Sequence, residues 1–199
     1  KYRDRLARAM GTGLVPLVVE QDLAYNQKTG ETVVAHDIVL DGSEPTLQQH
    51  FFDKISDVMD GALRVGARDH WPLLVLHLDF KTNEPAHHRA VWNLLQRHAA
   101  WLTTAPVSGD GTRVTAFKPG PLLVLTENGT DQEKDFTEWA AETGSYLLFG
   151  SIPGPSLPPT PDDRRRGELL ATSPSLLIPS PATSYRRWVN FPWAIVEVG

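Results

Sequence analysis

The chain has 199 residues, a length that favours a single domain with a sizeable core. Hydrophobic residues make up 41% of it and charged residues 22%, a composition typical of folded globular proteins and not of disordered ones. Its net charge of -5 argues against a nucleic-acid partner, because phosphate backbones are bound by a concentrated basic face.

Other absences narrow the class further. The chain has no cysteine, which excludes disulfides and thiolate sites. No apolar run approaches the roughly 20 residues of a membrane-spanning helix. Residue Lys1 is not an initiator methionine, so we expect an upstream segment to have been removed or to lie outside this chain. Neither the oligomeric state nor the compartment follows from these observations.

The first third of the chain predicts a helix, two strands and a second helix. Residues 2–10 suit a short amphipathic helix that ends at the following glycines. Residues 14–23 are rich in valine and predict a strand. Turn residues at 26–30 precede an apolar run at 32–35, which indicates a hairpin. Thr46 can cap a helix whose apolar residues recur at helical spacing to Leu63.

The rest of the chain continues the alternation of strands and helices. Strands are expected at 73–80, 122–127, 146–149 and within 188–198, with helices at about 84–102 and 132–141. This order predicts an α/β fold with a parallel sheet and helical crossovers. We expect one domain over 1–199, an incomplete TIM-type (β/α) barrel with about strands 2–6 of eight. An open doubly wound sheet is the alternative, although its glycine-rich phosphate loop is missing.

A proline-rich stretch at about 151–184 interrupts this pattern. Its prolines exclude a continuous helix or a central strand. A loop of this length is either a lid or wall over a site or a plain excursion, and the sequence leaves both open. Its basic run, 164–166, is interpreted as part of a solvated loop.

Charged and histidine residues stand at the ends of three apolar runs. Glu20 and Asp22 end the first strand, His36 follows the hairpin, and Asp79 and Lys81 end the strand at 73–80. Residues two apart on a strand share a face, so each pair projects to one side. Burying such a charge costs roughly several kcal/mol per ion unless the ion is paired or binds a metal. We therefore expect one polar site at the mouth of the barrel.

The chemistry of these side chains fits a phosphodiester. Converging carboxylates suit a hard divalent cation, Mg²⁺ or Ca²⁺. His36 can act as general acid or base, Lys81 can hold an anionic oxygen, and His77 lies one step deeper in the site. Taken singly, each group has a plainer interpretation: solvated edge-strand carboxylates, a structural Asp79–Lys81 ion pair, and a strand-end histidine.

These motifs resemble a known superfamily. The stretch VVEQDLAYNQKTGETVVAHDIVLDG, residues 18–42, resembles the signature of the glycerophosphodiester phosphodiesterases, and LHLDFKT, residues 76–82, resembles their next acidic-x-Lys motif. The motifs EQDL, VVAHD, HLDFK and PLLVLTEN are similar to those of an uncharacterised bacterial group with a barrel like phosphatidylinositol-specific phospholipase C. The resemblance covers about residues 1–128.

The resemblance implies roles for individual residues and also shows departures. It implies Glu20, Asp22 and Asp79 as metal ligands, His36 as one of two acid/base histidines, Lys81 as a phosphate contact and Glu127 as a residue lining the mouth. The second histidine of the family would precede Lys1 and is not in this chain. In addition, Asp79 replaces the usual Glu and Ile38 the usual Pro.

The first functional hypothesis is a metal-dependent phosphodiesterase-like hydrolase that acts on a glycerophosphodiester or a phospholipid headgroup. By the resemblance, this segment alone is expected to be inactive and the full-length protein active, in an extracytoplasmic location. The second hypothesis is a non-catalytic barrel that binds a phosphorylated or sugar ligand. A metal-dependent sugar isomerase or aldolase is a third possibility, but further ligands at later strand ends are missing.

Two other signals are weaker. The adjacent residues His87 and His88 diverge on a helix and are not expected to share a metal. Three aromatic residues near the last strand, Trp188, Phe191 and Trp193, could stack on a sugar or lipid headgroup. The alternative is that they pack in the core or against a lid.

Overall fold

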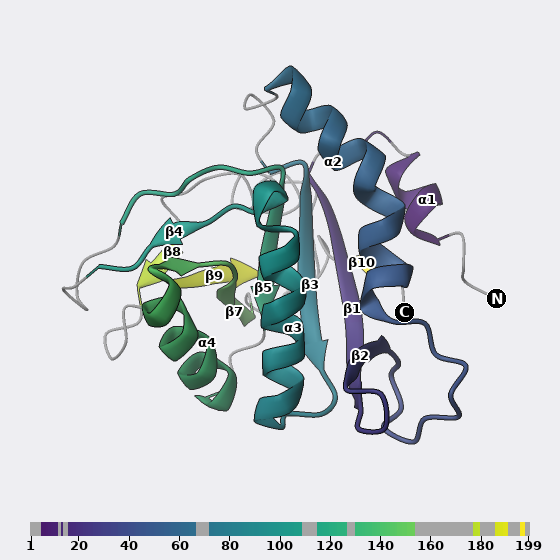
Figure 1. The fold of residues 1–199 in the computed structure, drawn as a ribbon. Helices are drawn as coiled ribbons and strands as arrows, with labels where there is room; N and C mark the ends of the chain where they lie inside the picture. The colour runs from purple at the N-terminus through teal and green to yellow at the C-terminus, as the bar shows by residue number, and fades with distance from the viewer. Residues whose placement is uncertain are drawn as a thin grey trace.

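The computed structural model describes residues 5–11, 13, 16–66, 72–108, 115–126, 130–153, 177–179, 186–190 and 196–197. Eight strands form its main sheet (Figure 1). They are β1 (Leu17–Asn26), β2 (Glu31–Val34), β3 (Leu74–Phe80), β5 (Leu122–Thr126), β7 (Phe149–Pro153), β8 (Leu177–Pro179), β9 (Arg186–Asn190) and β10 (Val196–Glu197).

The strand order is β10-β1-β3-β5-β7-β9-β8, with β2 paired to β1 outside this path. Every neighbouring pair from β10 to β9 is parallel. Strand β2 pairs antiparallel with β1, and β8 pairs antiparallel with β9. The predicted α/β class with a mostly parallel sheet and interleaved helices is therefore confirmed. Among the described residues no closed barrel is seen, because the end strands β8 and β10 do not pair with each other.

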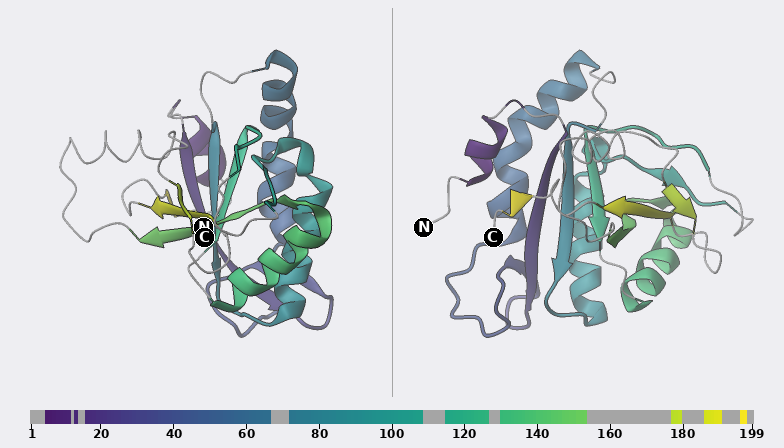
Figure 2. Two further views of the ribbon diagram at one scale, coloured as in Figure 1. Left: turned by 90° about the vertical axis from the view of Figure 1, so that its left-hand side faces the viewer. Right: turned by 180° about the vertical axis from the view of Figure 1, so that it is seen from behind.

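Helices cover one face of this sheet. Figure 2, in the view along the sheet, shows α2, α3 and α4 on the same side, while β7 and β9 turn steeply away toward the other side. A second, two-stranded sheet joins β4 to β6. The remaining elements have the bounds α1 (Arg5–Met10), η1 (Gln48–Phe52), α2 (Asp53–Val65), α3 (Pro85–Arg97), η2 (Ala99–Trp101), β4 (Ala105–Pro106), α4 (Thr130–Thr143) and β6 (Ser145–Tyr146).

The core lies between the sheet and these helices. Strand β5 is buried along its whole length, and β3 is buried except at Asp79. Trp92 of α3 packs against Phe136 and Trp139 of α4, with ring centroids 6.3 and 6.1 Å away. This aromatic packing joins the two helices, and Phe136 also lies 6.2 Å from the ring of Phe80 on β3.

The helix predicted from Thr46 begins as expected but with a different geometry. Thr46 and Gln49 form a reciprocal capping box, in which each backbone N–H donates to the other side chain at 3.2 Å. The first turns, Gln48–Phe52, are a π-helix that continues into α2. Periodicity alone does not separate these two helix types, because both place apolar residues on the core side.

The proline-rich stretch falls mostly outside the described residues, at 154–176 and 180–185. Its described parts are the end of β7 and the strand β8. The latter lies at the edge of the sheet, where a proline is tolerated. The choice between a lid and an excursion concerns residues that are not described. Two of the three candidate stacking aromatics, at 191 and 193, also lie outside the described residues.

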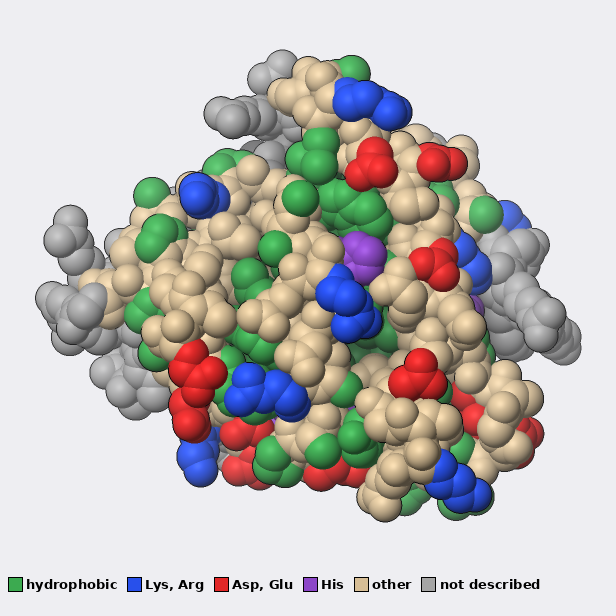
Figure 3. Space-filling view, in the orientation of Figure 1, with side chains coloured by type: hydrophobic (Ala, Val, Ile, Leu, Met, Phe, Trp, Pro, Cys, Tyr) green, Lys and Arg blue, Asp and Glu red, His purple; other side chains and the backbone are tan. Residues whose placement is uncertain are grey.

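Two further observations concern the apolar character of the helices and the charge of the surface. In the described part of the chain, no helix is both long enough and apolar enough to span a bilayer. On the helix-bearing face, acidic and basic side chains are interspersed and do not gather into one broad patch of either sign (Figure 3).

Candidate functional site

Strand β3 has one face toward the helices and one away from them. The ring of Phe80 contacts the rings of His87 and His88 on α3, with centroid distances of 4.9 and 5.2 Å. Because side chains alternate along a strand, His77 and Asp79 project from the opposite face.

The register between β1 and β3 places the polar residues of both strands side by side. Glu20 is the partner of His77, and Asp22 is the partner of Asp79. Partners in a parallel pair project to the same face, so all four side chains lie on the side away from the helices. Lys81 extends the ladder by donating its backbone N–H to the carbonyl of Leu23 at 2.8 Å.

Lys81 joins the two aspartates. Its Nζ lies 2.9 Å from Oδ1 of Asp22 and 2.6 Å from Oδ2 of Asp79, and each of the three side chains is 21% exposed. Partial burial lowers the pKa of Lys81, but the hydrogen bonds and charges of Asp79 and Asp22 outweigh it, so the pKa is raised above its usual value. The ammonium is therefore fully charged at neutral pH.

Two histidines contact carboxylates of this face, one at Asp22 and the other at Glu20. Nδ1 of His36 lies 3.3 Å from Oδ2 of Asp22, and its side chain is 76% exposed. His77 is buried, with Nδ1 3.2 Å from Oε2 of Glu20. We refer to the resulting set as the polar cluster, and it comprises Glu20, Asp22, His36, His77, Asp79 and Lys81.

The three carboxylates are close enough to share a cation. One oxygen from each of Glu20, Asp22 and Asp79 lies within 4.8 Å of the others. Oxygens on opposite sides of Ca²⁺ are roughly 4.6–5.2 Å apart, and those around Mg²⁺ roughly 4.2 Å. Three carboxylates against the Lys81 ammonium leave a formal charge of minus two, which a divalent cation would neutralise. The donor set thus fits a hard cation, and a spacing of up to 4.8 Å fits Ca²⁺ more closely than Mg²⁺.

The backbone beside Lys81 is held by groups that sequence reasoning missed. Thr82 Oγ1 accepts the backbone N–H of Tyr25 at 3.0 Å, and Nδ1 of His87 lies 2.8 Å from the Thr82 carbonyl oxygen. Burial lowers the pKa of His87 to about 4, so its ring is neutral at pH 7. This neutral, fully buried ring fixes the chain immediately after Lys81. The sequence signal was the proximity of Thr82 to the strand end.

His88 belongs to a different set, on the helix side of the sheet. Its Nδ1 lies 2.7 Å from Oδ2 of Asp135, and its Nε2 lies 3.3 Å from Oδ1 of Asn83. Gln132 donates to the same Asn83 oxygen at 2.7 Å and accepts from the hydroxyl of Thr126. We call these five residues the buried His88 network. The adjacent histidines of α3 thus serve separate hydrogen-bond systems.

The residues predicted for the site therefore have different outcomes. Glu20, Asp22, His36, Asp79 and Lys81 come together as expected, and His77 lies one step deeper beside Glu20. Glu127 was expected to line the mouth of the barrel. It follows the last residue of β5, Thr126, and lies outside the described residues.

Comparison of the chain with models of protein families, with curated proteins and with solved structures finds no match.

Proposed function

We propose that this chain carries the metal-binding and phosphate-contacting residues of a metal-dependent phosphodiesterase-like hydrolase. Its substrate would be a glycerophosphodiester or a phospholipid-type phosphodiester. The supporting observation is the convergence of three carboxylates from two parallel strands, within 4.8 Å of one another and beside Lys81. Asp79 lies near the carboxyl end of β3, where ligands bind in parallel α/β folds, and Glu20 and Asp22 lie beside this strand in the middle of β1.

Glu20, Asp22 and Asp79 would hold the cation, Mg²⁺ or Ca²⁺, through one oxygen each. A bound divalent cation supplies Lewis-acid stabilisation of a phosphoryl oxygen. Lys81 would contact a second phosphoryl oxygen, since its ammonium is charged at neutral pH and its side chain is 21% exposed. The buried ring of His77 would orient the Glu20 carboxylate through the contact of its Nδ1 with Oε2.

His36 is the proposed proton-transfer residue. Its ring is largely exposed, so it can reach a substrate oxygen, and its Nδ1 lies 3.3 Å from Asp22. This contact favours the tautomer with the proton on Nδ1, which leaves Nε2 as the base. Nε2 would take the proton of the attacking water as the water oxygen bonds to phosphorus, and it would pass this proton to the leaving-group oxygen as the phosphorus–oxygen ester bond breaks.

We also propose that the open sheet is part of a TIM-type barrel. Consecutive strands β1, β3, β5, β7 and β9 are neighbours and parallel, and β10 lies on the free side of β1. This order is expected when a (β/α) barrel returns to its first strand. The polar cluster would then face the barrel interior.

A metal titration tests the proposal without requiring turnover. We expect the chain to bind Mn²⁺, Mg²⁺ or Ca²⁺ in calorimetry with one site, and Asp22→Asn to abolish binding. The matched control is Asp37→Asn, an exposed carboxylate next to His36 but outside the cluster. Unchanged metal affinity in Asp22→Asn would contradict the proposed site.

A second experiment addresses the reaction. In the full-length protein, hydrolysis of glycerophosphocholine should require the metal and stop with chelator, and His36→Ala should reduce kcat by about 100- to 10,000-fold. Metal affinity should be unchanged in this variant because His36 is not a proposed ligand.

One observation favours a second candidate function, a barrel that binds a phosphorylated ligand without turnover. Of the two histidines in the polar cluster, only His36 is exposed, and His77 is engaged with Glu20. A single accessible histidine is fewer than the resemblance implies for catalysis. Metal-dependent binding of glycerol phosphate with no hydrolysis of diesters would support this function instead.

A further inference from the structure

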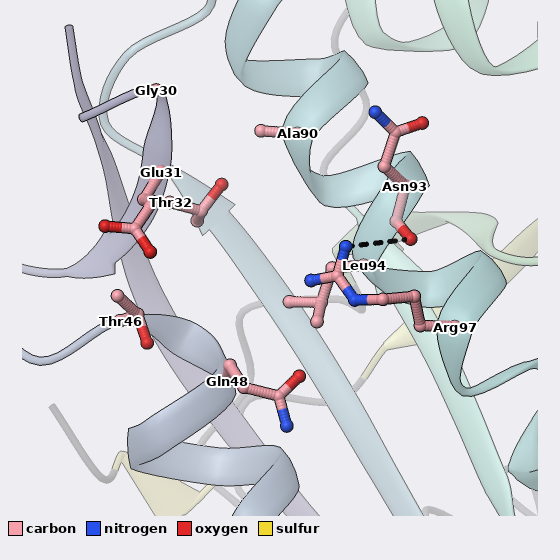
Figure 4. A pocket seen from close by; sticks show the side chains of 9 residues that line it. All are labelled: Gly30, Glu31, Thr32, Thr46, Gln48, Ala90, Asn93, Leu94 and Arg97. Carbon is pink, nitrogen blue, oxygen red and sulfur yellow. Dashed lines mark hydrogen bonds between the residues drawn. The ribbon is translucent and has the colours of Figure 1, made fainter. Parts of the chain in front are cut away.

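A cavity of about 300 Å³ opens on the helix side of the molecule, between the start of β2, the chain entering η1, and α3 (Figure 4). The residues that α3 contributes recur at helical spacing and belong to one face of that helix. A volume of this size is at the lower end of small-molecule sites, so the cavity suits a ligand of few atoms. Its lining comprises Gly30, Glu31, Thr32, Thr46, Gln48, Ala90, Asn93, Leu94 and Arg97.

The cavity lies on the opposite side of the sheet from the polar cluster. Thr32 is the antiparallel partner of Tyr25, and the ring of Tyr25 stacks on His87 of α3 at 5.6 Å. Partners across an antiparallel pair share a face, so Thr32 also projects toward the helices. A ligand in this cavity is therefore separate from one bound at Asp22 and Asp79.

A buried hydroxyl group in the lining lacks a partner. Thr32 is 6% exposed, and its Oγ1 has no hydrogen-bond partner among the described residues. Figure 4 shows this hydroxyl pointing from β2 toward α3. A hydroxyl that loses water without gaining another partner is unfavourable in a folded protein. A polar ligand atom in the cavity would satisfy it, which makes Thr32 the observation that points to an occupant.

Arg97 brings hydrogen-bond donors to the same space. Its guanidinium extends from α3 into the gap between this helix and β2 (Figure 4). In the described part of the chain no ion pair holds it, and its Nη1 makes a long contact of 3.5 Å with the Asn93 carbonyl oxygen. Most of the five guanidinium N–H donors therefore remain available to a ligand.

Other polar side chains of the lining are engaged within the protein. Gln48 donates to Oδ1 of Asp53, and its Oε1 lies 2.9 Å from Nε2 of His98. Oγ1 of Thr46 accepts the backbone N–H of Gln49 at 3.2 Å. These contacts fix the wall of the cavity at the start of η1, so this wall gives the cavity its shape.

Arg97 also sets the charge of the cavity. Glu31 precedes Thr32 on β2 and therefore projects from the other face of the strand. Figure 4 draws its carboxylate away from α3, so it does not neutralise the guanidinium. A single carboxylate group would balance this one positive charge. A dianion such as inorganic phosphate would keep an unpaired charge in a partly enclosed site, which is unfavourable.

We propose that this cavity binds a short-chain monocarboxylate. The ligand carboxylate would accept hydrogen bonds from the guanidinium of Arg97 and the hydroxyl of Thr32. Its alkyl chain would lie against Ala90 and Leu94, which line the same side of the cavity. The planar guanidinium matches a carboxylate in geometry as well as in charge. The lining contains no aromatic ring, so it offers no stacking platform for a sugar or a nucleobase.

The test is a ¹H–¹⁵N NMR titration of the full chain at neutral pH with acetate, propionate and butyrate, against propionamide and inorganic phosphate. We expect saturable shifts with the three acids at residues 30–32, 46–48 and 90–97. Affinity should rise by about fourfold for each added CH₂ group, because each one removes further apolar surface from water. Propionamide has the shape of propionate without its charge and should bind at least about tenfold more weakly.

Two substitutions separate the contributions of the proposed contacts. Arg97→Gln should weaken butyrate binding by at least about tenfold, and Arg97→Lys, which keeps the charge without the planar fork, should weaken it less. Thr32→Val keeps the shape of the side chain and removes the hydroxyl, so it should weaken binding by about tenfold. Urea unfolding of Thr32→Val without ligand should show no loss of stability, because the hydroxyl has no protein partner to lose.

The matched control is Arg64→Gln, an exposed arginine of α2 outside the lining, which should bind butyrate as the parent does. Asp22→Asn should also bind butyrate normally, so failure of the metal proposal would not affect this result. Absence of saturable shifts with the acids, equal affinity for propionamide, or preferred binding of phosphate would overturn the proposal. Undiminished butyrate binding in Arg97→Gln or in Thr32→Val would do the same.

Discussion

The two faces of the sheet use the same residue types in different ways. On the face away from the helices, the polar cluster gathers three carboxylates, two of which contact the Lys81 ammonium, and its aspartates and lysine are each 21% exposed. On the helix face, His88 is fully buried and contacts Asp135 and Asn83 through its two ring nitrogens. The first set has unbalanced negative charge and solvent access, whereas in the second each ring nitrogen of His88 lies within hydrogen-bond distance of an oxygen.

We interpret this difference as that between a candidate site and a structural support. A buried polar group is tolerated when its partners satisfy it, and it then stabilises one arrangement of the elements that carry it. The buried His88 network joins the loop after β3 to α4 and β5. The excess negative charge of the polar cluster is not matched in this way, and the proposed cation would neutralise it. Substitutions on the two faces should therefore affect different measurements.

The largest expected effect is on metal affinity at the polar cluster. Asp22→Asn removes one proposed ligand and one partner of Lys81. Loss of even an outer-shell partner costs roughly 10- to 100-fold in metal affinity, so loss of a ligand should cost about 100-fold or more. Calorimetric titration with Mn²⁺ measures this, and Asp37→Asn is the control. A variant that bound metal normally would remove the distinction between the two faces.

The next effect is on the free energy of unfolding at the buried network. His88→Leu leaves Asp135 partly buried without its imidazole partner, which should destabilise the chain by about 2–4 kcal/mol. The same substitution at exposed His36 should change stability by about 0.5 kcal/mol or less. Urea unfolding of both variants makes the comparison. Equal losses of stability would mean that the polar cluster also serves as a support.

The pH dependence of stability isolates His87. Burial lowers its pKa from 6.5 to about 4 in the folded chain, so the unfolded chain binds a proton first as the pH falls. This contribution is fully present above pH 6.5 and is lost between pH 6.5 and about 4, by up to about 3 kcal/mol. Urea midpoints measured across this range should fall more steeply for the parent than for His87→Gln. Parallel curves would show that His87 does not carry the effect.

The smallest expected effect comes from Lys81→Met. Removal of the ammonium leaves three uncompensated carboxylates, so affinity for a divalent cation should rise by about tenfold at low salt. Binding of glycerol phosphate should weaken at the same time, because its cationic contact is lost. Raising the salt concentration should reduce the gain in metal affinity. A fall in metal affinity would mean that Lys81 organises the ligands more than it competes with the cation.

Much of the fold was predictable because each strand and helix has a local signature. The apolar run at β3 and the turn before β2 identified their elements, and parity placed Glu20 with Asp22 and Asp79 with Lys81. The π-helical start of the helix after Thr46 was not predicted, because it satisfies the same apolar spacing. Pairing of the short strand β10 with β1 was also missed, since two residues carry too little pattern to choose a partner.

The sequence by itself determined which side chains share a face of each strand and that their charges need partners, because the two-residue period and the cost of burying charge are local properties. Only the tertiary structure decided that Glu20 stands beside His77 and Asp22 beside Asp79, and that His87 and His88 serve separate networks. Register between distant strands and the packing of α3 on the sheet fix these contacts. Both depend on the whole core and not on any single segment.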